Sequence, residues 1–246
     1  RSGSLKELNV REGITAVALG WFVMSVFGAI PFVLTGEIPF YIDALFETIS
    51  GFTTTGSSIL SDVEALSYAS LFWRSFTHWI GGMGVLVFLL SLLPLTGGSH
   101  VNLMKAESPG PSVGKLVPKV RFTARILYVL YVALTLLQVL VMLMGGMTLY
   151  EALCTSFGTA GTGGFGIYGD SIARFSPFLQ WAITVFMIAF GVNFNVYFLL
   201  YMRRPKDALH CEEMHWYLGI IAAAALLICA IGYDVTLTLV NNPRQI

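Results

Sequence analysis

Five stretches of the chain run for about 20 residues without Asp, Glu, Lys or Arg, the length that a helix needs to cross a hydrocarbon core roughly 30 Å thick. Hydrophobic residues make up 56% of the chain and charged residues 11%, so too little polar surface remains for a water-soluble domain. The chain is therefore predicted to be an all-α integral membrane protein with five spanning helices. These stretches are Gly13 to Gly36, Ser75 to Leu95, Ile126 to Tyr150, Phe175 to Met202 and Met214 to Tyr233.

The charged residues are distributed unevenly between the two sides of such a protein. Lys and Arg near the ends of spanning helices stay on the cytoplasmic side, which places the N-terminal end of the chain in the cytoplasm. The cytoplasmic groups are Arg1, Lys6 and Arg11; Lys105, Lys115, Lys119, Arg121 and Arg125; and Arg203, Arg204 and Lys206. The outer side is predicted to be acidic, which raises the local concentration of cations. It carries Glu37, Asp43, Glu47, Asp62, Glu64, Glu151, Asp170 and Asp234.

An internal repeat links the first two spans to the next two. Shifting the chain by 108 positions superposes two segments that are too apolar for ordinary loops and too short to cross a membrane. The matched pairs include Thr54 with Thr162, Gly56 with Gly164, Asp62 with Asp170, and Trp73 with Trp181. Repeats of this kind are common in transport proteins. Each unit is predicted to contain an outer helix, a short re-entrant helix (about 40–51 and 148–159), a glycine-containing loop and an inner helix.

The two loops are Thr53 to Ser57 and Gly161 to Gly166. Non-helical backbone at membrane depth is tolerated only where protein buries it or where it lines a watery cavity. Cation filters use backbone carbonyl oxygens in place of hydration water, and glycine reaches the unusual dihedral angles that such a backbone needs. One such cluster is as consistent with an ordinary turn as with a filter. Two clusters in register favour a filter.

The motifs around these loops resemble the Trk/Ktr family of potassium transporters, most closely its TrkH branch. Ser50 to Gly56, Trp73 to Ser75 and Trp79 to Gly84 resemble the first pore repeat of that family, and Gly163 to Gly166 with Gly191 to Asn195 resemble the second. The resemblance implies helix, pore loop, helix units arranged pseudo-fourfold around one pore. It implies filter glycines at Gly56 and Gly164, and potassium ligands on the residues just before them: Thr54, Thr55, Thr162 and Gly163.

Only about half of that set of repeats is present. The predicted organisation is a first pore repeat over 13–95, a cytoplasmic loop over 96–125, a second pore repeat over 126–202, and a cytoplasmic turn with the first helix of a third repeat over 203–246. We therefore expect the chain to be part of a longer protein, and expect that it does not close a four-sided pore alone.

The resemblance also implies a function and partners. The expected function is potassium uptake by the membrane subunit of a Trk-type system in the cell inner membrane, with potassium as the transported ion and no cofactor in this chain. The expected partners are a second copy of the protein and a cytoplasmic nucleotide-binding regulatory subunit. Transport of another cation, sodium-coupled or non-selective, and a non-transport membrane subunit are the alternatives. Proton-coupled, sodium-dependent and channel-like mechanisms all remain open. An enzyme is not expected, because no Gly-x-Ser-x-Gly or His-Glu-x-x-His motif occurs.

Other residues near the loops allow two interpretations. Asp62 and Asp170 follow the loops at equal distance, and they either attract ions at the pore mouth or cap the return of the chain to the surface. Arg74 is expected to extend its side chain to the membrane interface, and an electrostatic role beside the pore is the alternative. His78 is expected to be a hydrogen-bonded packing residue. Small residues allow membrane helices to approach closely, so close packing rather than hinging is expected at Gly81, Gly82 and Gly84.

Overall fold

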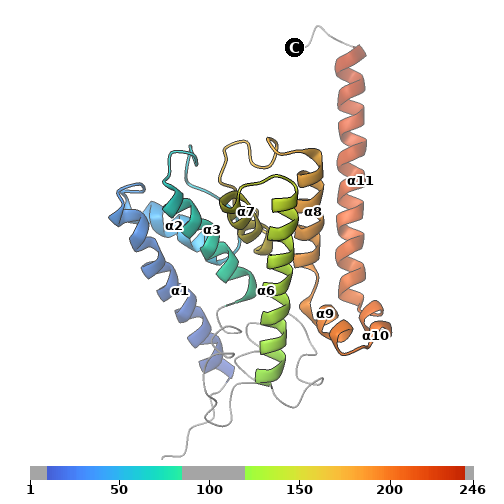
Figure 1. The fold of residues 1–246 in the computed structure, drawn as a ribbon, viewed down its shortest axis with the longest axis horizontal. Helices are drawn as coiled ribbons and strands as arrows, with labels where there is room; N and C mark the ends of the chain where they lie inside the picture. Colours follow the sequence, from blue (N-terminus) through green and yellow to red (C-terminus); the bar gives the residue numbers. More distant parts are fainter. Residues whose placement is uncertain (1–9, 85–119, 242–246) are drawn as a thin grey trace, which may run out of the picture. The chain divides into compact units, whose positions relative to one another are not determined.

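The computed structural model describes residues 10–84 and 120–241 (Figure 1). Every regular element within these two ranges is a helix, which confirms the all-α fold expected from the sequence. The chain divides into two compact units, residues 1–191 and residues 192–246. Most of the predicted cytoplasmic loop over 96–125, and the end of the second predicted span over 85–95, lie outside the described residues.

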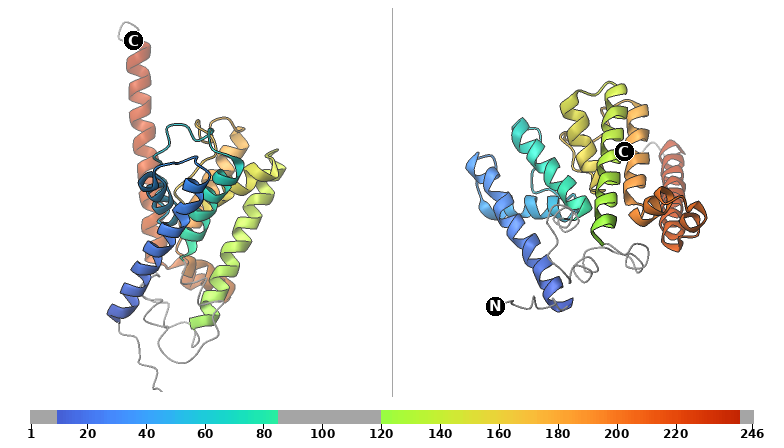
Figure 2. Two further views of the ribbon diagram at one scale, coloured as in Figure 1. Left: turned by 90° about the vertical axis from the view of Figure 1, so that its left-hand side faces the viewer. Right: turned by 60° about the horizontal axis from the view of Figure 1, so that its bottom comes forward.

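The first unit contains the two repeats, each built from a long helix, a short helix and a third helix. The short helices begin and end one residue later than predicted, and they lie against the longer helices of their own repeats (Figures 1 and 2). The first repeat consists of α1 (Val10–Leu34), α2 (Tyr41–Phe52) and α3 (Tyr68–Met83). The second consists of α6 (Val120–Met144), α7 (Leu149–Ala160) and α8 (Pro177–Gly191).

Helix α3 joins the two repeats, because it packs against α2 of its own repeat and against α7 of the next. It begins at Tyr68, with the Ser67 hydroxyl accepting a hydrogen bond from the amide of Ser70 as an N-cap. The span predicted from uncharged residues began only at Ser75. The helix includes Arg74 because this charge is buried and paired, as described below.

Two further predicted spans end differently in the structure. Helix α6 stops at Met144 and not at Tyr150, because the chain turns at Gly146 with φ of 95°. The fourth predicted span, 175–202, is not continuous. It is divided into α8 and α9 (Phe194–Tyr201), and a new helix begins where the Val196 amide donates to the carbonyl of Asn193 at 2.9 Å.

The second unit consists of α9, α10 (Pro205–Leu209) and α11 (Glu212–Asn241). Helices α9 and α10 pack together, and Pro205 occupies the first turn of α10, where its missing amide hydrogen is not needed. Arg204 forms an exposed ion pair with Asp207 at 2.7 Å. The long apolar α11 contains the fifth predicted span.

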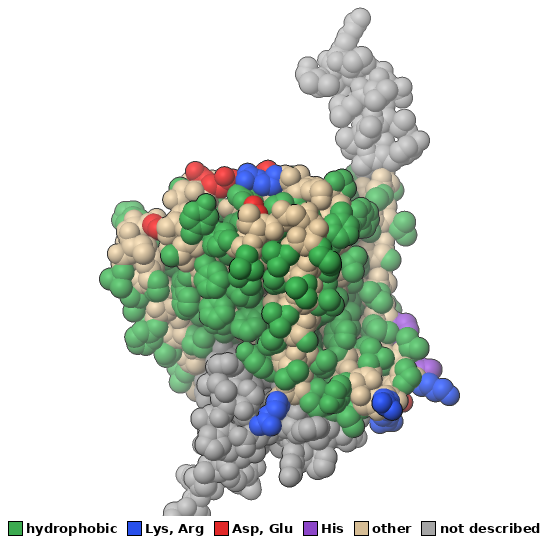
Figure 3. Space-filling model, in the orientation of Figure 1, with side chains coloured by type: hydrophobic (Ala, Val, Ile, Leu, Met, Phe, Trp, Pro, Cys, Tyr) green, Lys and Arg blue, Asp and Glu red, His purple; other side chains and the backbone are tan. Residues whose placement is uncertain are grey.

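Several helices have the length or the surface of membrane helices. Two of the described helices contain candidate spans, Arg125–Met144 and Glu212–Ile231, and two shorter apolar segments are Ala18–Leu34 and Pro177–Gly191. Large hydrophobic side chains lie exposed on the first unit, among them Phe27 of α1. Figure 3 shows a broad hydrophobic band on this unit, with acidic side chains gathered along one edge. This distribution is typical of a protein whose sides face lipid.

Candidate functional site

The first loop, Thr53–Ser57, continues directly from the C-terminal end of α2. The amides of Thr54 and Thr55 donate to the carbonyls of Gly51 and Ser50, both at 3.0 Å. The Thr53 hydroxyl lies 2.8 Å from the Thr55 hydroxyl in a further hydrogen bond. The threonine side chains and the last turn of α2 therefore hold the loop backbone.

The two loops share an unusual backbone conformation. Thr54 has φ of 54° and Gly56 has φ of 76°, while Thr162 has φ of 61° and Gly164 has φ of 76°. The residue between them in each loop keeps negative φ. The left-handed region costs a threonine roughly 1–2 kcal/mol, so both loops hold this strained conformation at the same repeat position. A backbone whose φ alternates in sign turns successive carbonyl groups toward one side, as a row of ion-coordinating oxygens requires.

The loops meet backbone to backbone. A Cβ atom at Gly56 would overlap the carbonyl oxygen of Gly163, and a Cβ atom at Gly163 would lie 2.5 Å from the carbonyl oxygen of Thr54. Neither position has room for a side chain. Two segments more than 100 residues apart in the sequence thus bring their backbones into direct contact.

The remaining predicted ligand residues lie in the same two loops. The side chains of Thr55 and Thr162 are exposed. Gly164 is also exposed, and a Cβ atom there would have the Met187 Cε atom of α8 at 3.5 Å, an ordinary contact. The loop-to-loop contacts therefore involve Thr54, Gly56 and Gly163.

Behind the first loop lies a buried carboxylate that the sequence analysis did not assign to the site. Glu47 of α2 is 1% exposed, and its carboxylate accepts hydrogen bonds from the Ser58 hydroxyl at 2.9 Å and from the Ile59 amide at 2.9 Å. It also forms an ion pair with Arg74 of α3. Glu47 thus connects α2, which precedes the first loop, to the residues that follow the loop. Because it is buried, it does not belong to the acidic outer surface that the sequence predicts.

Arg74 extends this network to the second repeat. Its Nη1 group donates to the carbonyl of Gly166 at 2.8 Å, and its guanidinium lies 3.7 Å from the centre of the Phe165 ring. Because Arg74 is only 3% exposed, the expectation that it extends to the membrane interface is wrong. Comparison of the two repeats could have predicted the pairing of Glu47 with Arg74 from the sequence. The positions equivalent to Glu47 and Arg74 are Thr155 and Ala182, so both charges are absent together, as for a paired interaction.

The two predicted pore-mouth aspartates have different partners on the surface of the first unit. Asp62 accepts a hydrogen bond from the Glu64 amide at 2.9 Å, which caps the turn after the first loop. Asp170 pairs with Arg174 at 2.8 Å, and Arg174 also pairs with Glu64 at 3.0 Å. Arg174 thus bridges the segments that follow the two loops.

A second acidic group supports the start of α7, outside the spanning helices. Glu151 forms a capping box with Thr148 and accepts a hydrogen bond from the Tyr168 hydroxyl at 2.6 Å. Burial opposes ionisation of this carboxyl, but the hydrogen bonds from Tyr168 and Thr148 outweigh burial and hold its pKa below the ordinary value of 4.5. This network attaches the chain after the second loop to the helix that precedes it.

The glycines near the end of α3 lie against the ends of both short helices. A Cβ atom at Gly81 would overlap the carbonyl oxygen of Phe52, the last residue of α2. A Cβ atom at Gly82 would lie 3.0 Å from the carbonyl oxygen of Ala160, the last residue of α7. Both positions are therefore close-packing sites. Gly84 differs, because it caps the C-terminal end of α3 with φ of 72°.

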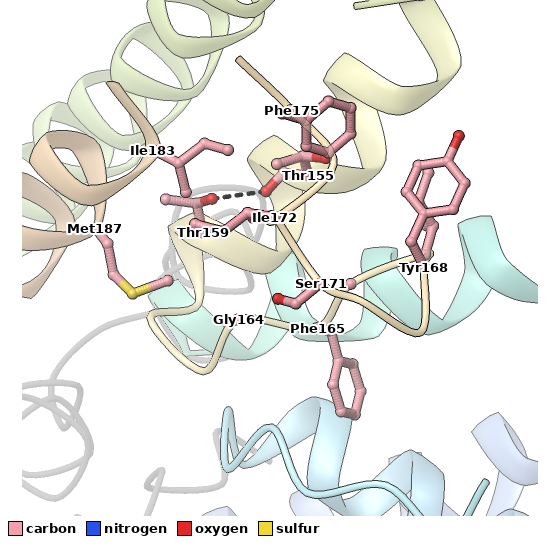
Figure 4. A pocket seen from close by; sticks show the side chains of 12 residues that line it. Thr155, Thr159, Gly164, Phe165, Tyr168, Ser171, Ile172, Phe175, Ile183 and Met187 are labelled. Atoms are coloured by element: carbon pink, nitrogen blue, oxygen red, sulfur yellow. Dashed lines mark hydrogen bonds between the residues drawn. The ribbon is translucent and has the colours of Figure 1, made fainter. Parts of the chain in front are cut away.

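A hollow lies beside the second loop, between α7 and α8 (Figure 4). In Figure 4 the Thr159 hydroxyl donates to the carbonyl of Thr155 at 2.7 Å on one wall, and Met187 reaches toward Gly164. Thr155 occupies the repeat position of Glu47, so no carboxylate crosses this space. The lining residues are Thr155, Thr159, Gly164, Phe165, Gly166, Ile167, Tyr168, Ser171, Ile172, Phe175, Ile183 and Met187.

The described residues contain no group of three or more His, Cys, Asp and Glu side chains placed to hold a metal ion. The oxygen atoms described at the contact between the loops are the backbone carbonyls of Thr54 and Gly163, and carbonyl oxygens suit a hard, weakly held cation.

The fold and this site define a class of protein: a membrane protein, helical throughout its described residues, in which two repeated units bring glycine-containing loops together. The chain belongs to the TrkH family, described as cation transport proteins, because the family profile matches residues 1–239. This match confirms the family that the loop motifs indicated.

Individual relatives agree with the family assignment. The chain is 35% identical to the Trk system potassium uptake protein TrkH of Salmonella typhimurium over 246 residues, which cover 96% of this chain and 51% of that protein. It is 37% identical to the TrkH protein of Escherichia coli K12 over 218 residues, which cover 87% and 45%. The crystal structure of the potassium transporter TrkH from Vibrio parahaemolyticus matches with a TM-score of 0.73 and 29% identity, over 91% of this chain and 46% of that one. The chain spans about half the length of the curated relatives it matches.

Proposed function

We propose that the chain supplies two sectors of a potassium-selective pore in a potassium uptake protein of the cell inner membrane. The observation that carries this proposal is the shared φ pattern of two loops that meet backbone to backbone. The relatives named as potassium uptake proteins support potassium as the transported ion. The carbonyl oxygens proposed as potassium ligands are those of Thr54, Thr55, Thr162 and Gly163, and Gly56 and Gly164 allow the backbone to adopt the conformation that these carbonyls need.

The proposed chemistry is replacement of hydration water by carbonyl oxygens. A potassium ion that enters the loops loses water, and neutral carbonyl dipoles compensate for this loss without holding the ion as tightly as carboxylates would. The carboxylate of Glu47 is neutralised by Arg74 behind the loop. Its role in this proposal is therefore to fix the loop backbone and not to bind the ion.

The rest of the pore and its partners are also part of the proposal. Further helix, loop, helix units of the full-length protein complete a pseudo-fourfold arrangement, and two copies of the protein associate in the membrane. A nucleotide-binding regulatory subunit binds the cytoplasmic side, where the N-terminal end of the chain also lies. The basic segment Arg203, Arg204 and Lys206 supports this orientation.

The test is rubidium uptake by cells that lack their own potassium uptake systems and express the complete gene that encodes this chain. We expect uptake with the wild type and its loss with Gly56→Asp, because the new side chain occupies the meeting point of the loops. Gly36→Asp is the matched control. Gly36 also has positive φ, 73°, but it is exposed and a Cβ atom there meets nothing within 4 Å.

Two results would contradict the proposal. One is absence of rubidium uptake by a wild-type protein that is shown to be inserted in the membrane. The other is equal uptake by the Gly56→Asp and Gly36→Asp proteins at equal membrane levels, which would mean that ions do not pass the meeting point of the loops.

A further inference from the structure

The two loops differ at one backbone hydrogen bond. In the first loop, the amide of Thr55 donates to the carbonyl of Ser50 at 3.0 Å. In the second loop, the carbonyl equivalent to Ser50 belongs to Gly158, and it accepts from the amide of Gly164 at 3.1 Å. The amide of Gly163, equivalent to that of Thr55, therefore needs a different acceptor.

That acceptor is a side chain from the other repeat. The amide of Gly163 donates to the Nε2 atom of His78 on α3 at 3.1 Å. His78 is fully buried, and its ring lies 4.6 Å from the centre of the Phe165 ring. Cβ atoms at Gly161 and Gly163 would both overlap the imidazole, so the loop backbone lies directly on the ring. The residue at the equivalent position of α8 is Phe186, which has no acceptor.

The imidazole ring of His78 has one buried nitrogen atom without a hydrogen-bond partner in the described part of the chain, which a packing role does not explain. Nε2 accepts a hydrogen bond only when it carries no proton, so the neutral ring carries its proton on Nδ1. Among the described residues, the buried Nδ1 atom of His78 has no hydrogen-bond partner. Leaving a buried polar group unpaired costs about 1–3 kcal/mol. A Phe or Leu side chain would fill the same space without this cost, so the acceptor at Nε2 distinguishes histidine from a packing residue.

The hydrogen bond to His78 fixes more than the amide of Gly163. The Gly163 N–H group and the Thr162 carbonyl belong to the same peptide unit, which is planar and trans, so they point in opposite directions. We propose that His78 is a positioning residue for ion selectivity: by holding the Gly163 amide, it aims the Thr162 carbonyl away from α3 and toward the ion. In the first loop, Ser50 fixes the Thr54 carbonyl in the same way through Thr55. This inference rests on the proposed function of the loops.

The test compares two variants of the complete protein that differ in whether residue 78 offers a hydrogen-bond acceptor at the position of Nε2. His78→Gln keeps an acceptor oxygen at the same number of bonds from the backbone as Nε2, and His78→Met has a similar size and no such acceptor. Gln138→Met is the control, because Gln138 is a fully buried polar residue of the neighbouring helix α6. The readout is the preference for rubidium over sodium, measured as rubidium uptake at increasing sodium concentrations.

We expect His78→Met to lower the preference for rubidium over sodium about fivefold, as loss of one hydrogen bond of average strength implies. His78→Gln should stay within about twofold of the wild type, and Gln138→Met should not change the preference. A purely structural role would lower the amount of protein and its uptake in both His78 variants without changing the preference.

Three outcomes would overturn the proposal: an unchanged preference in His78→Met, an equal loss in His78→Gln and His78→Met, or an equal loss in Gln138→Met. If His78→Met does not reach the membrane, His78→Asn replaces it. The asparagine oxygen stops one bond short of the Nε2 position, so a wild-type preference in that variant would also overturn the proposal. Failure of the proposed function is a separate result, because wild-type rubidium uptake would then be absent or insensitive to Gly56→Asp.

Discussion

Gly56 combines two requirements that are separate elsewhere in the chain. Its φ of 76° lies in the left-handed region, and the carbonyl of Gly163 occupies the place of its missing side chain. Gly36 has a similar φ of 73° but open space around it. Thr54 and Thr162 adopt positive φ with full side chains. Backbone strain is therefore tolerated in the loops, and close approach of the two backbones is what makes glycine necessary at Gly56.

The pair Gly56→Ala and Gly36→Ala separates backbone strain from steric overlap. Both changes add roughly 1 kcal/mol of strain at positive φ, and only the first places a methyl group against the facing loop. We expect Gly56→Ala to lower rubidium uptake at least tenfold, which corresponds to about 1.4 kcal/mol or more. Uptake by Gly36→Ala should stay within about twofold of the wild type. Similar uptake by the two variants would show that the overlap is relieved without consequence.

Glu151, in the first turn of α7, makes the stability of the fold depend on pH. Its pKa in the folded protein lies below the ordinary value of 4.5, so its ionised form stabilises the fold at neutral pH. This contribution is complete well above pH 4.5 and is lost as the pH falls through the lowered pKa. We expect Glu151→Gln to lower the melting temperature of the purified protein at about pH 7, and the difference from the wild type to shrink as the pH falls below 4.5 and through the lowered pKa. A difference that is constant over this range would contradict the expectation.

At the scale of elements, α3 is the helix on which the second loop rests. Arg74 and His78, one turn apart on α3, contact Gly166 and Gly163 of the second loop. Gly82, one further turn along, lies against the end of α7. A single helix of the first repeat therefore orients the loop of the second repeat through charge, hydrogen bonding and close packing.

Because Glu47 and Arg74 form a buried ion pair, we expect single and double variants at these positions to differ markedly in melting temperature. Glu47→Thr leaves the Arg74 charge buried without its partner, and Arg74→Ala leaves the Glu47 carboxylate buried, each at a cost of about 3–5 kcal/mol. The double variant carries the residues that the second repeat has at these positions, Thr155 and Ala182. We expect its melting temperature to be higher than that of either single variant. A double variant as unstable as the sum of the two single changes would show that the pair is not coupled.

At the scale of the whole first unit, the repeats are joined by close packing of α3 against α7. Gly82 is one point of close approach, where the Tyr131 hydroxyl of α6 lies 2.5 Å and the Ala160 carbonyl oxygen of α7 lies 3.0 Å from the position of a Cβ atom. A buried hydrophobic cluster joins the repeats as well. It contains Ala29, Phe32, Ile38, Ala44, Leu66 and Leu71 of the first repeat and Cys154 and Ile167 of the second.

Gly82→Val tests whether this packing holds the repeats together. Overpacking destabilises by about 1–3 kcal/mol, and here it separates α3 from α7. Gly20→Val is the control, because Gly20 lies inside α1 with nothing within 4 Å of a Cβ atom. We expect a lower melting temperature for Gly82→Val only. Equal melting temperatures for the two variants would indicate that the interface between the repeats accepts an added side chain.

Much of the fold followed from regular patterns in the sequence. Uncharged stretches located the long helices, and the repeat located α2 and α7 to within one residue. The wrong predictions concern positions where the folded structure differs from what the pattern of charged and uncharged residues along the chain indicates. Arg74 was expected to extend from its helix to the membrane interface, but its side chain is buried and paired with Glu47. Uncharged sequence was taken as one helix over 175–202, but the chain leaves the helix after Gly191.

The sequence by itself determined the class of fold, the repeat and the two loops, because helix length, hydrophobicity and glycine positions depend on neighbours along the chain. Only the tertiary structure decided which atoms meet. It placed Gly56 against Gly163, buried the Arg74 charge beside Glu47, and gave the Gly163 amide an acceptor on His78. These contacts join residues of different elements, and their formation depends on how α2, α3 and α7 pack. Residue types and spacing do not specify that packing, because side chains far apart in the sequence interact only after the chain has folded.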